Sequence, residues 1–415
     1  MRQMKDSGIP WVGEIPETWK VGRIDNFYML RNTKVSDRDY QPLSVTKNGI
    51  VPQLETAAKT NAHDDRKLVR SGDFVINSRS DRRGSCGISS YEGSVSLINT
   101  VLAPRGEMTA RFYDWLFHTI QFADEFYRWG HGIVDDLWTT TYQDMKKINI
   151  PVPPLSEQTS IATYLDAKCA EIDALSADVQ SEIDLLESYK RSVITEAVTK
   201  GLDKNAAMKD SGIPWIGEIP ETWECIKFKY IATVKSNLVS PNDYGDYPQI
   251  SPESIEKETG RLLPFKTVCE SGVISGNHLF YKGQILYSKI RPKLNKVTIA
   301  PFDGLCSADM YPIETSLDKQ FFVYALRSDA FLLNVGMITE DRIKMPKINR
   351  EELANICFAV PSREEQTSIA TYLDAKCAEI DAVIDQKREQ IAVLNDYKKS
   401  VIYEYVTGKK EVPAR

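Results

Sequence analysis

Residues 157–174 read EQTSIATYLDAKCAEIDA, and residues 365–382 repeat this stretch letter for letter. A second stretch is also present twice: residues 4–19 read MKDSGIPWVGEIPETW, and residues 208–223 differ from it by one isoleucine in place of valine. The segments that follow residues 19 and 223 share almost nothing. This arrangement indicates one scaffold that is kept fixed while two segments inserted in it diverge or are exchanged. It is typical of a tandem reader that carries two recognition modules of different specificity.

The first copy of the longer repeat begins a helical pattern. Ser156 can cap a helix that runs to about Lys200, because no proline or glycine follows until Gly201. At 1.5 Å per residue this helix would be roughly 65 Å long. Its apolar residues recur every seven positions at Leu165, Ile172, Val179, Leu186 and Val193, with Ile161, Leu175, Ile183 and Tyr189 between them.

The second copy begins a matching helix. Ser362-Arg363-Glu364-Glu365 is a capping-box pattern, and the helix is predicted to end near Gly408. Because an amphipathic helix of this length cannot bury its apolar side alone, we predict that the two helices bury each other as an antiparallel intramolecular coiled coil. The alternative is that each helix packs on its own globular domain. The apolar positions of the second helix are Ile369, Leu373, Ile380, Ile384, Ile391, Leu394 and Val401.

The two inserted segments have the character of mixed α/β domains. Both contain β-branched and aromatic runs bounded by glycine or proline, which predict short strands. At an offset of 211 residues Gly72 matches Gly283 and Ser96 matches Ser307, so we predict one fold with two different surfaces. The predicted strands are 73–77, 94–101, 284–288 and 296–300, and the predicted helices are 112–126 and 319–333.

We therefore predict an α+β fold in which two α/β domains are joined by two long antiparallel helices, in a pseudo-twofold, circularly permuted repeat. The short repeat should wrap irregularly against a helix, the first copy on the C-terminal helix and the second on the central helix. The predicted divisions are a frame segment 1–19, a first domain 20–152, a central helix 153–204, a second frame segment 205–223, a second domain 224–360, and a C-terminal helix and tail 361–415.

The charge is distributed unevenly. The whole chain carries −6, but residues 20–152 carry +2, residues 224–360 carry +1 and residues 153–204 carry −5. The domains are thus only weakly basic, so any DNA contact must rely on local patches. Composition points to a cytoplasmic protein without a signal peptide, a membrane span or metal-ligand spacing, whose seven cysteines are reduced and buried.

Motifs of several enzyme classes are missing from the sequence. An adenine methyltransferase would need Asn/Asp-Pro-Pro-Tyr/Phe, but the one Pro-Pro pair is Pro153-Pro154 at a helix start. There is no GxxxxGK[ST] motif for a nucleotide, and Asp135 replaces the third glycine of a GxGxxG motif that begins at Gly130. The pair Asp144 and Lys146 is better explained as helix surface than as a nuclease site. These absences favour a binding protein over an enzyme.

The SGIPWVGEIPETW opening, the PPLSEQTSIAxxLD helix start and the repetition of both resemble the specificity subunit of type I restriction–modification systems. The resemblance covers the whole chain and implies two target recognition domains that each read half of a bipartite site in double-stranded DNA. It implies no catalytic centre and no cofactor in this chain. S-adenosylmethionine, ATP and magnesium would belong to the partners, which are two methyltransferase subunits and, through them, restriction subunits.

Two other interpretations stay open. The chain could be a scaffold with two protein-binding modules and no DNA role, or an enzyme of an unrecognised class. Binding to no duplex sequence, even with partner subunits, would favour the scaffold. Activity of the purified chain alone would favour the enzyme.

Candidate DNA contacts lie in two places in each domain. In the first domain RSDRRGS supplies Arg79, Arg82 and Arg83, whose guanidinium groups suit guanine or phosphate, although an internal pair with Asp81 would leave a plain solvated loop. The matching stretch of the second domain supplies Lys289, Arg291, Lys293, Asn295 and Lys296.

The second place is GHGIVDDLWTTT at 130–141, where Thr139 and Thr140 carry hydroxyls that could read groove edges. Its counterpart TEDRIKMPK supplies Arg342 and Lys344. A surface loop is the alternative for both. The four tryptophans of the short repeats are predicted to pack rather than to stack on bases, because a base reader should differ between the halves.

Overall fold

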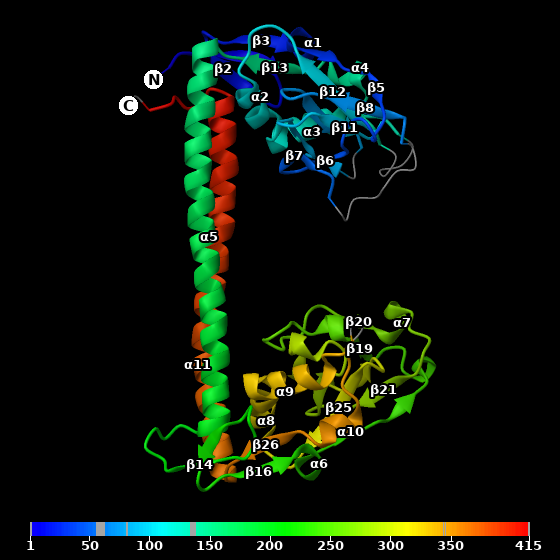
Figure 1. The fold of residues 1–415 in the computed structure, drawn as a ribbon, viewed down its shortest axis with the longest axis vertical. Helices are drawn as coiled ribbons and strands as arrows, with labels where there is room; N and C mark the ends of the chain where they lie inside the picture. The colour runs from blue at the N-terminus through cyan, green and yellow to red at the C-terminus, as the bar shows by residue number, and fades with distance from the viewer. Residues whose placement is uncertain are drawn as a thin grey trace. The chain divides into compact units, whose positions relative to one another are not determined.

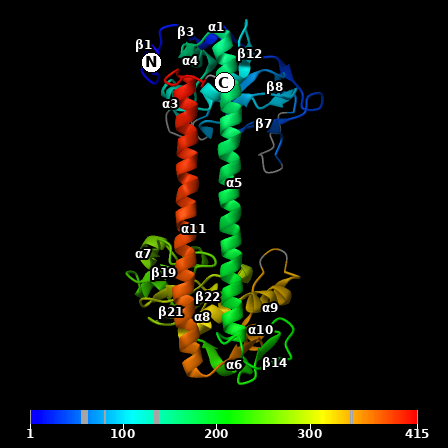
Figure 2. The same ribbon diagram turned by 90° about the vertical axis from the view of Figure 1, so that its left-hand side faces the viewer.

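The computed structural model describes residues 2–54, 63–79, 82–132, 138–342, 344 and 346–413. The chain separates into two compact units, one made of Met1–Val179 with Glu389–Arg415 and the other of Gln180–Arg388. We call them the first and second units. Each unit contains one of the inserted domains and a part of both long helices (Figures 1 and 2).

The long helices have the predicted extents, α5 at Leu155–Lys200 and α11 at Arg363–Val406. The capping box at Ser362 is confirmed: its Oγ accepts the Glu365 N–H at 3.3 Å, and a Glu365 carboxylate oxygen accepts the Ser362 N–H at 3.2 Å. The cap predicted at Ser156 is wrong. Because α5 already begins at Leu155, Ser156 lies within its first turn.

The helices pair antiparallel in both units, as predicted. Lys398 binds Asp173 at 2.6 Å in the first unit, and Lys190 binds Asp381 at 2.6 Å in the second. Leu175 and Tyr189 do not join the buried side as expected, because they lie on its outer flank and are 46% and 52% exposed. Of the predicted apolar positions, Leu186, Val193, Ile391 and Leu394 are half-buried, and the buried ones are Ile161, Leu165, Ile172, Val179, Ile183, Ile369, Leu373, Ile380, Ile384 and Val401.

The two short repeats are more regular than predicted. Each forms an antiparallel hairpin, β1 (Met4–Ile9) with β2 (Gly13–Pro16), and β14 (Met208–Asp210) with β15 (Glu218–Pro220). Their predicted positions are confirmed. In the first unit the Tyr403 hydroxyl of α11 donates to the Trp11 carbonyl at 2.9 Å, and in the second unit Trp223 belongs to one apolar core with Val198 of α5.

The tryptophans that end the short repeats act as packing residues. Trp19 and Trp223 are fully buried, and each indole N–H donates to a glutamate at the start of a long helix. Trp19 donates to Glu157 at 2.9 Å, and Trp223 donates to Glu365 at 3.3 Å. We call the duplicated hairpins and helix starts the frame. The same tryptophan–glutamate contact therefore joins hairpin to helix in both halves of the frame.

The first domain is built on a four-stranded sheet of order β10-β9-β12-β4 and a three-stranded sheet of order β11-β8-β5. Strand β13 pairs with β3, so the two ends of the domain lie together. Its elements are β3 Lys20–Arg23, α1 Ile24–Phe27, β4 Tyr28–Leu30, β5 Lys34–Val35, β6 Leu43–Thr46, β7 Gly49–Pro52, β8 Arg66–Val69, β9 Phe74–Asn77, β10 Cys86–Ile88, β11 Gly93–Val95, β12 Asn99–Pro104, α2 Ala110–Phe117, α3 Ile120–Arg128, α4 Tyr142–Met145 and β13 Asn149–Val152.

The second domain has sheets of order β17-β25-β22-β23 and β18-β21-β24-β19-β20, and its ends meet where β16 pairs with β26. Its elements are β16 Glu224–Lys227, α6 Phe228–Ile231, β17 Ala232–Val234, β18 Leu238–Val239, η3 Pro241–Asp243, β19 Pro248–Ile250, η4 Pro252–Ser254, β20 Lys266–Thr267, α7 Val268–Ser271, β21 Asn277–Phe280, β22 Ile285–Ser288, η5 Pro292–Leu294, β23 Val297–Ile299, β24 Gly304–Cys306, β25 Met310–Thr315, α8 Lys319–Arg327, α9 Asp329–Thr339, α10 Arg350–Ala354 and β26 Cys357–Val360.

The shared plan of the domains is visible in their four-stranded sheets, because β4-β12-β9-β10 and β17-β25-β22-β23 correspond strand by strand. Gly72 and Gly283 precede the equivalent strands β9 and β22 with φ of +89° and +83°, which a residue with a side chain rarely adopts. Some predicted boundaries are wrong. The run 94–101 is two strands, β11 and β12, and each predicted helix is two helices, with Ser328 capping α9.

All seven cysteines are free, but Cys269 is exposed and Cys225 and Cys357 are half-buried, contrary to the prediction that all are buried. Over the described residues no group of three or more His, Cys, Asp or Glu side chains could hold a metal ion. In the same part of the chain no single helix has the length and apolar composition to cross a membrane. The bent pair α8 and α9 meets that test by length and composition only.

Candidate nucleic-acid interface

The two candidate segments of the first domain lie side by side. Arg79, directly after β9, forms an isolated β-bridge with Thr139, and the Thr140 N–H donates to the Ser78 carbonyl at 3.0 Å. Thr139 also bridges His131. The sequence predicted each segment separately, and the structure joins them into one paired loop.

The second domain repeats this arrangement. Ile290, after β22, bridges Lys347, and the Arg291 N–H donates to the Pro346 carbonyl at 2.7 Å. The Ile348 N–H donates to the Lys289 carbonyl at 2.9 Å. In both units the loop after the equivalent strand β9 or β22 is thus paired with the segment before a short helix, α4 or α10. We call these the paired loops.

The side chains of the first paired loop differ in what they can reach. Arg79, Arg82 and Arg83 are exposed, but Arg83 forms an ion pair with Asp124 and lies 5.0 Å from the Tyr127 ring centroid. Thr139 is half-buried. Thr140 is buried, and its hydroxyl donates to the Phe126 carbonyl at 2.8 Å, so it holds the loop. Asp81 and residues 133–137 of the predicted segment lie outside the described residues.

In the second paired loop Arg291, Lys293 and Lys344 are exposed. Two other candidates serve the fold, since Asn295 is buried and donates to the Arg327 carbonyl at 3.2 Å, and the Lys296 ammonium donates to the Pro252 carbonyl at 2.6 Å. Direct contact with DNA stays a prediction for every candidate. The positions of Thr140 and Asn295 speak against it for those two.

Arg342 is held by a carboxylate. Its guanidinium binds Glu352, and this hydrogen bond is the main reason that the Glu352 pKa lies below its usual value. The same hydrogen bond raises the pKa of Arg342. To reach DNA, Arg342 would have to leave this partner, so its first role in the structure is to link the second paired loop to α10.

The backbone of the second paired loop is constrained. Arg291 and Asn295 lie on either side of η5 with φ of +45° and +51°, in the left-handed region that residues with a side chain rarely occupy. Such positions cost about 1–3 kcal/mol each and cluster at functional sites. The fold therefore keeps the exposed Arg291 and Lys293 on a fixed turn rather than on a free loop.

One cationic neighbour of this loop, Arg350, was missed at the sequence level. Arg350 Cζ lies 5.8 Å from the Tyr311 ring centroid, and the Nζ of the predicted, half-buried Lys289 lies 5.5 Å from it. The pKa of His278 is lowered, mainly by burial and further by the positive charges of Arg350 and Lys289. The three residues meet only because β21, β22 and α10 come together, so no local motif could reveal them.

Comparison with known proteins shows which protein family has this architecture. The family model described as the type I restriction modification DNA specificity domain matches the chain twice, at residues 16–184 and 220–392. The chain belongs to this family. Each match covers one domain and much of the long helix that follows it, so the duplicated architecture is the family's architecture present twice.

Individual relatives agree with this assignment. The chain is 32% identical over 281 residues to the EcoDI specificity subunit of Escherichia coli, across 64% of this chain and 63% of that relative, which is just under two thirds of its length. It is 25% identical to a putative MjaX specificity subunit of Methanocaldococcus jannaschii, across 97% and 96% of the two chains.

A solved structure shares the fold. It comes from a study of complex assembly and conformational transition of a type I restriction–modification system. Its TM-score is 0.69 at 14% identity, with 95% of this chain and 99% of that chain covered. The likeness extends over both units and both long helices.

Proposed function

We propose that this chain is the DNA sequence-recognition subunit of a type I restriction–modification complex and reads a bipartite, asymmetric site with one domain per half. The observation that carries the proposal is that two domains with equivalent sheets present different paired loops from one duplicated frame. An identical frame can support the same assembly twice, while different loops can read two different half-sites.

The paired loops supply the chemistry for reading. Arginine can make two hydrogen bonds to guanine in the major groove, and both arginine and lysine bind phosphate. The exposed candidates of the first loop are Arg79, Arg82 and Arg83, and those of the second are Arg291, Lys293 and Lys344. Because each domain carries almost no net charge, the chain alone should neutralise few phosphates and bind DNA weakly.

Under this proposal the chain has no catalytic role. Methyltransferase subunits would bring S-adenosylmethionine and modify one adenine, flipped out of the duplex, in each half-site. Restriction subunits, with ATP and magnesium, would join through them. The relatives named as specificity subunits and the missing enzyme motifs support this division of labour.

The helix surface supports two equivalent partners. Three exposed apolar positions of α5 recur on α11 at an offset of 208 residues, although they lie outside the identical stretches. A repeated surface of this kind suits one methyltransferase subunit per unit. Leu185, Tyr189 and Val383 in the second unit are 70%, 52% and 37% exposed, and their counterparts Val393, Tyr397 and Leu175 in the first unit are 62%, 48% and 46% exposed.

Exchange of one domain tests the proposal. Residues 20–152 are replaced by the domain of another family member, the chain is produced with its methyltransferase subunits, and methylated sites are mapped by sequencing. We expect one half-site to change and the other to stay. A change in both half-sites would contradict the proposal, and a complex that assembles but binds no duplex sequence would favour the protein scaffold.

A further inference from the structure

The same frame glutamine holds both domains through a backbone group. In the first unit Gln158 accepts the Thr109 N–H at 2.9 Å and donates to the Pro153 carbonyl at 2.9 Å. In the second unit Gln366, its counterpart in the repeat, accepts the Asp318 N–H at 2.7 Å and donates to the Pro361 carbonyl at 3.0 Å. Both side chains are buried, with 4% and 3% exposure, so both ends of each amide are committed to these contacts.

The domain residues that these glutamines contact are structurally equivalent. Thr109 is the N-cap of α2, and Asp318 is the N-cap of α8. Every residue other than proline has a backbone N–H, so this contact does not depend on the side chain at the N-cap. The glutamine can therefore accept domains of unrelated sequence.

About two turns further along α5 and α11, a frame aspartate makes a second shared contact. Asp166 accepts from the Arg111 guanidinium at 2.7 Å and the Trp115 indole at 3.0 Å. Its counterpart Asp374 accepts from the Gln320 amide at 2.7 Å and the Tyr324 hydroxyl at 2.7 Å.

The donors occupy the same places although their residue types differ. Arg111 and Gln320 are the second residues of α2 and α8, and Trp115 and Tyr324 are the sixth. A carboxylate accepts hydrogen bonds from all four of these groups. The frame thus recognises a donor at each of two helix positions, not a particular residue.

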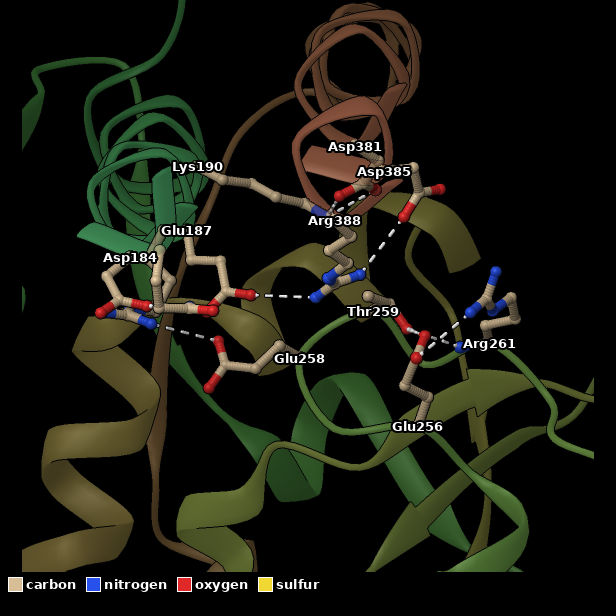
Figure 3. Close-up of polar contacts among 12 residues, drawn as sticks. Asp184, Glu187, Lys190, Glu256, Glu258, Thr259, Arg261, Asp381, Asp385 and Arg388 are labelled. Carbon is tan, nitrogen blue, oxygen red and sulfur yellow. Dashed lines mark hydrogen bonds and ion pairs between the residues drawn. The ribbon is translucent and has the colours of Figure 1, made fainter. Parts of the chain in front are cut away.

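Another ion-pair network lies in the second unit. Arg191 of α5 binds Glu258 of the domain at 3.4 Å. Arg388 of α11 binds Glu187 of α5 at 3.2 Å, beside the domain loop that carries Glu256 and Thr259 (Figure 3). At the offset of 208 residues the counterparts of Arg191 and Arg388 are Lys399, in the first unit, and Gln180, the first residue of the second unit; both lie outside the identical stretches. This network is an adaptation to the second domain, in contrast to the duplicated glutamine and aspartate.

We propose that Gln158 with Asp166, and Gln366 with Asp374, form a duplicated docking site. This site orients any domain whose helix at the place of α2 or α8 offers an N-cap N–H and hydrogen-bond donors at its second and sixth residues. These four are positioning residues. The inference rests on the proposed function only where it treats the inserted domains as interchangeable DNA readers; the docking itself is independent of DNA.

The first test needs no DNA. Hydrogen exchange of the full chain is measured for Asp374→Ala and Gln366→Ala, with Asp385→Ala as the control, since Asp385 lies on the same helix and binds only Arg388 in the described contacts. We expect about tenfold faster exchange at the start of α8 in the two docking variants. Exchange at α2 should stay unchanged, and Asp374→Asn, which keeps an acceptor oxygen, should restore most of the protection.

The reciprocal pair Asp166→Ala and Gln158→Ala should loosen α2 and leave α8 protected. Equal exchange in the docking variants and the control would overturn the proposal, and so would loosening of both domains by either pair. Circular dichroism identifies a variant that fails to fold, in which case the Asp374→Asn and Asp166→Asn chains carry the comparison through a smaller loss at one domain only.

The second test adds function. The complex with methyltransferase subunits is assembled with Asp374→Ala, and its methylated sites are sequenced. We expect the sequence selectivity to be relaxed in one half-site and unchanged in the other. Asp166→Ala should relax the selectivity of the other half-site instead. Local loosening by exchange together with no bipartite site at all would contradict the proposed function and leave the docking site standing. Normal exchange with an intact bipartite site would do the opposite.

Discussion

The ends of the long helices allow a quantitative test of how the frame is closed. Gly408 follows α11 with φ of +73°, and a Cβ built there would lie 2.6 Å from Pro16 Cγ and 3.0 Å from Trp19 Cη2. Gly408→Ala therefore combines two costs. A left-handed backbone costs a residue with a side chain about 1–2 kcal/mol, and forcing a methyl group into a packed core costs about 1–3 kcal/mol.

Gly13→Ala separates the two costs. Gly13 also has φ of +73° and lies in the same unit, but a Cβ there would meet no atom within 4 Å. This variant should lose only the backbone term, so Gly408→Ala should be less stable than Gly13→Ala by about 2 kcal/mol. For a folding unit of this size that difference corresponds to about 4–8 °C in Tm.

The two variants and the parent chain are compared by scanning calorimetry and by urea unfolding, and the transition that shifts is assigned to the first unit by hydrogen exchange. Gly201→Ala is the counterpart in the second unit, where φ is +77° and the Cβ would lie 3.2 Å from Trp223 Cζ2, so an intermediate loss is expected. Equal losses for Gly408→Ala and Gly13→Ala would refute the close packing of the helix end on Trp19.

The second paired loop, His278 and the long helices can each be tested. Arg291→Ala should weaken DNA binding by the assembled complex about tenfold or more without a change in Tm, whereas Asn295→Ala should lower Tm, as measured by gel shift and calorimetry. The pKa of His278, measured by NMR, should lie below its ordinary value of about 6.5. Arg350→Ala should raise the His278 pKa only partly, because burial is the larger cause of the shift. Since the pKa is lower in the folded chain, the stability that the neutral imidazole contributes is full above about pH 6.5 and is lost as the pH falls below that value through the folded pKa. Four residues inserted after Val179, about 6 Å of helix, should lengthen the nonspecific spacer by about one or two base pairs and leave both half-sites unchanged, as read by methylation mapping.

Much of the fold could be predicted because the two pairs of repeats reveal the duplicated frame and the two long helices. An uninterrupted run from Leu155 to Lys200 with apolar residues every seven positions has few alternatives to a long paired helix. The failures are local. Leu175 and Tyr189 fit the spacing of the apolar pattern but lie at the exposed edge of the helix pair. The sequence alone does not determine where the buried side of a helix ends.

The short repeats were predicted as irregular because their proline and glycine content hides a hairpin that is stabilised by the helices beneath it. The candidate interface was predicted as four separate segments. Their pairing across the sheet, as in the bridge between Arg79 and Thr139, depends on contacts distant in sequence. The burial of Thr140 and Asn295 could not be predicted either, because the sequence does not distinguish a polar loop residue that faces solvent from one that holds the loop together.

The central claim is that one chain reads two half-sites through two domains on a duplicated frame. Its most direct test is methylation-aware sequencing of DNA modified by this chain together with its methyltransferase subunits. We expect one bipartite motif, with two different half-sites separated by a gap of fixed length and one methylated adenine in each. A single contiguous motif, or methylation without sequence selection, would contradict it.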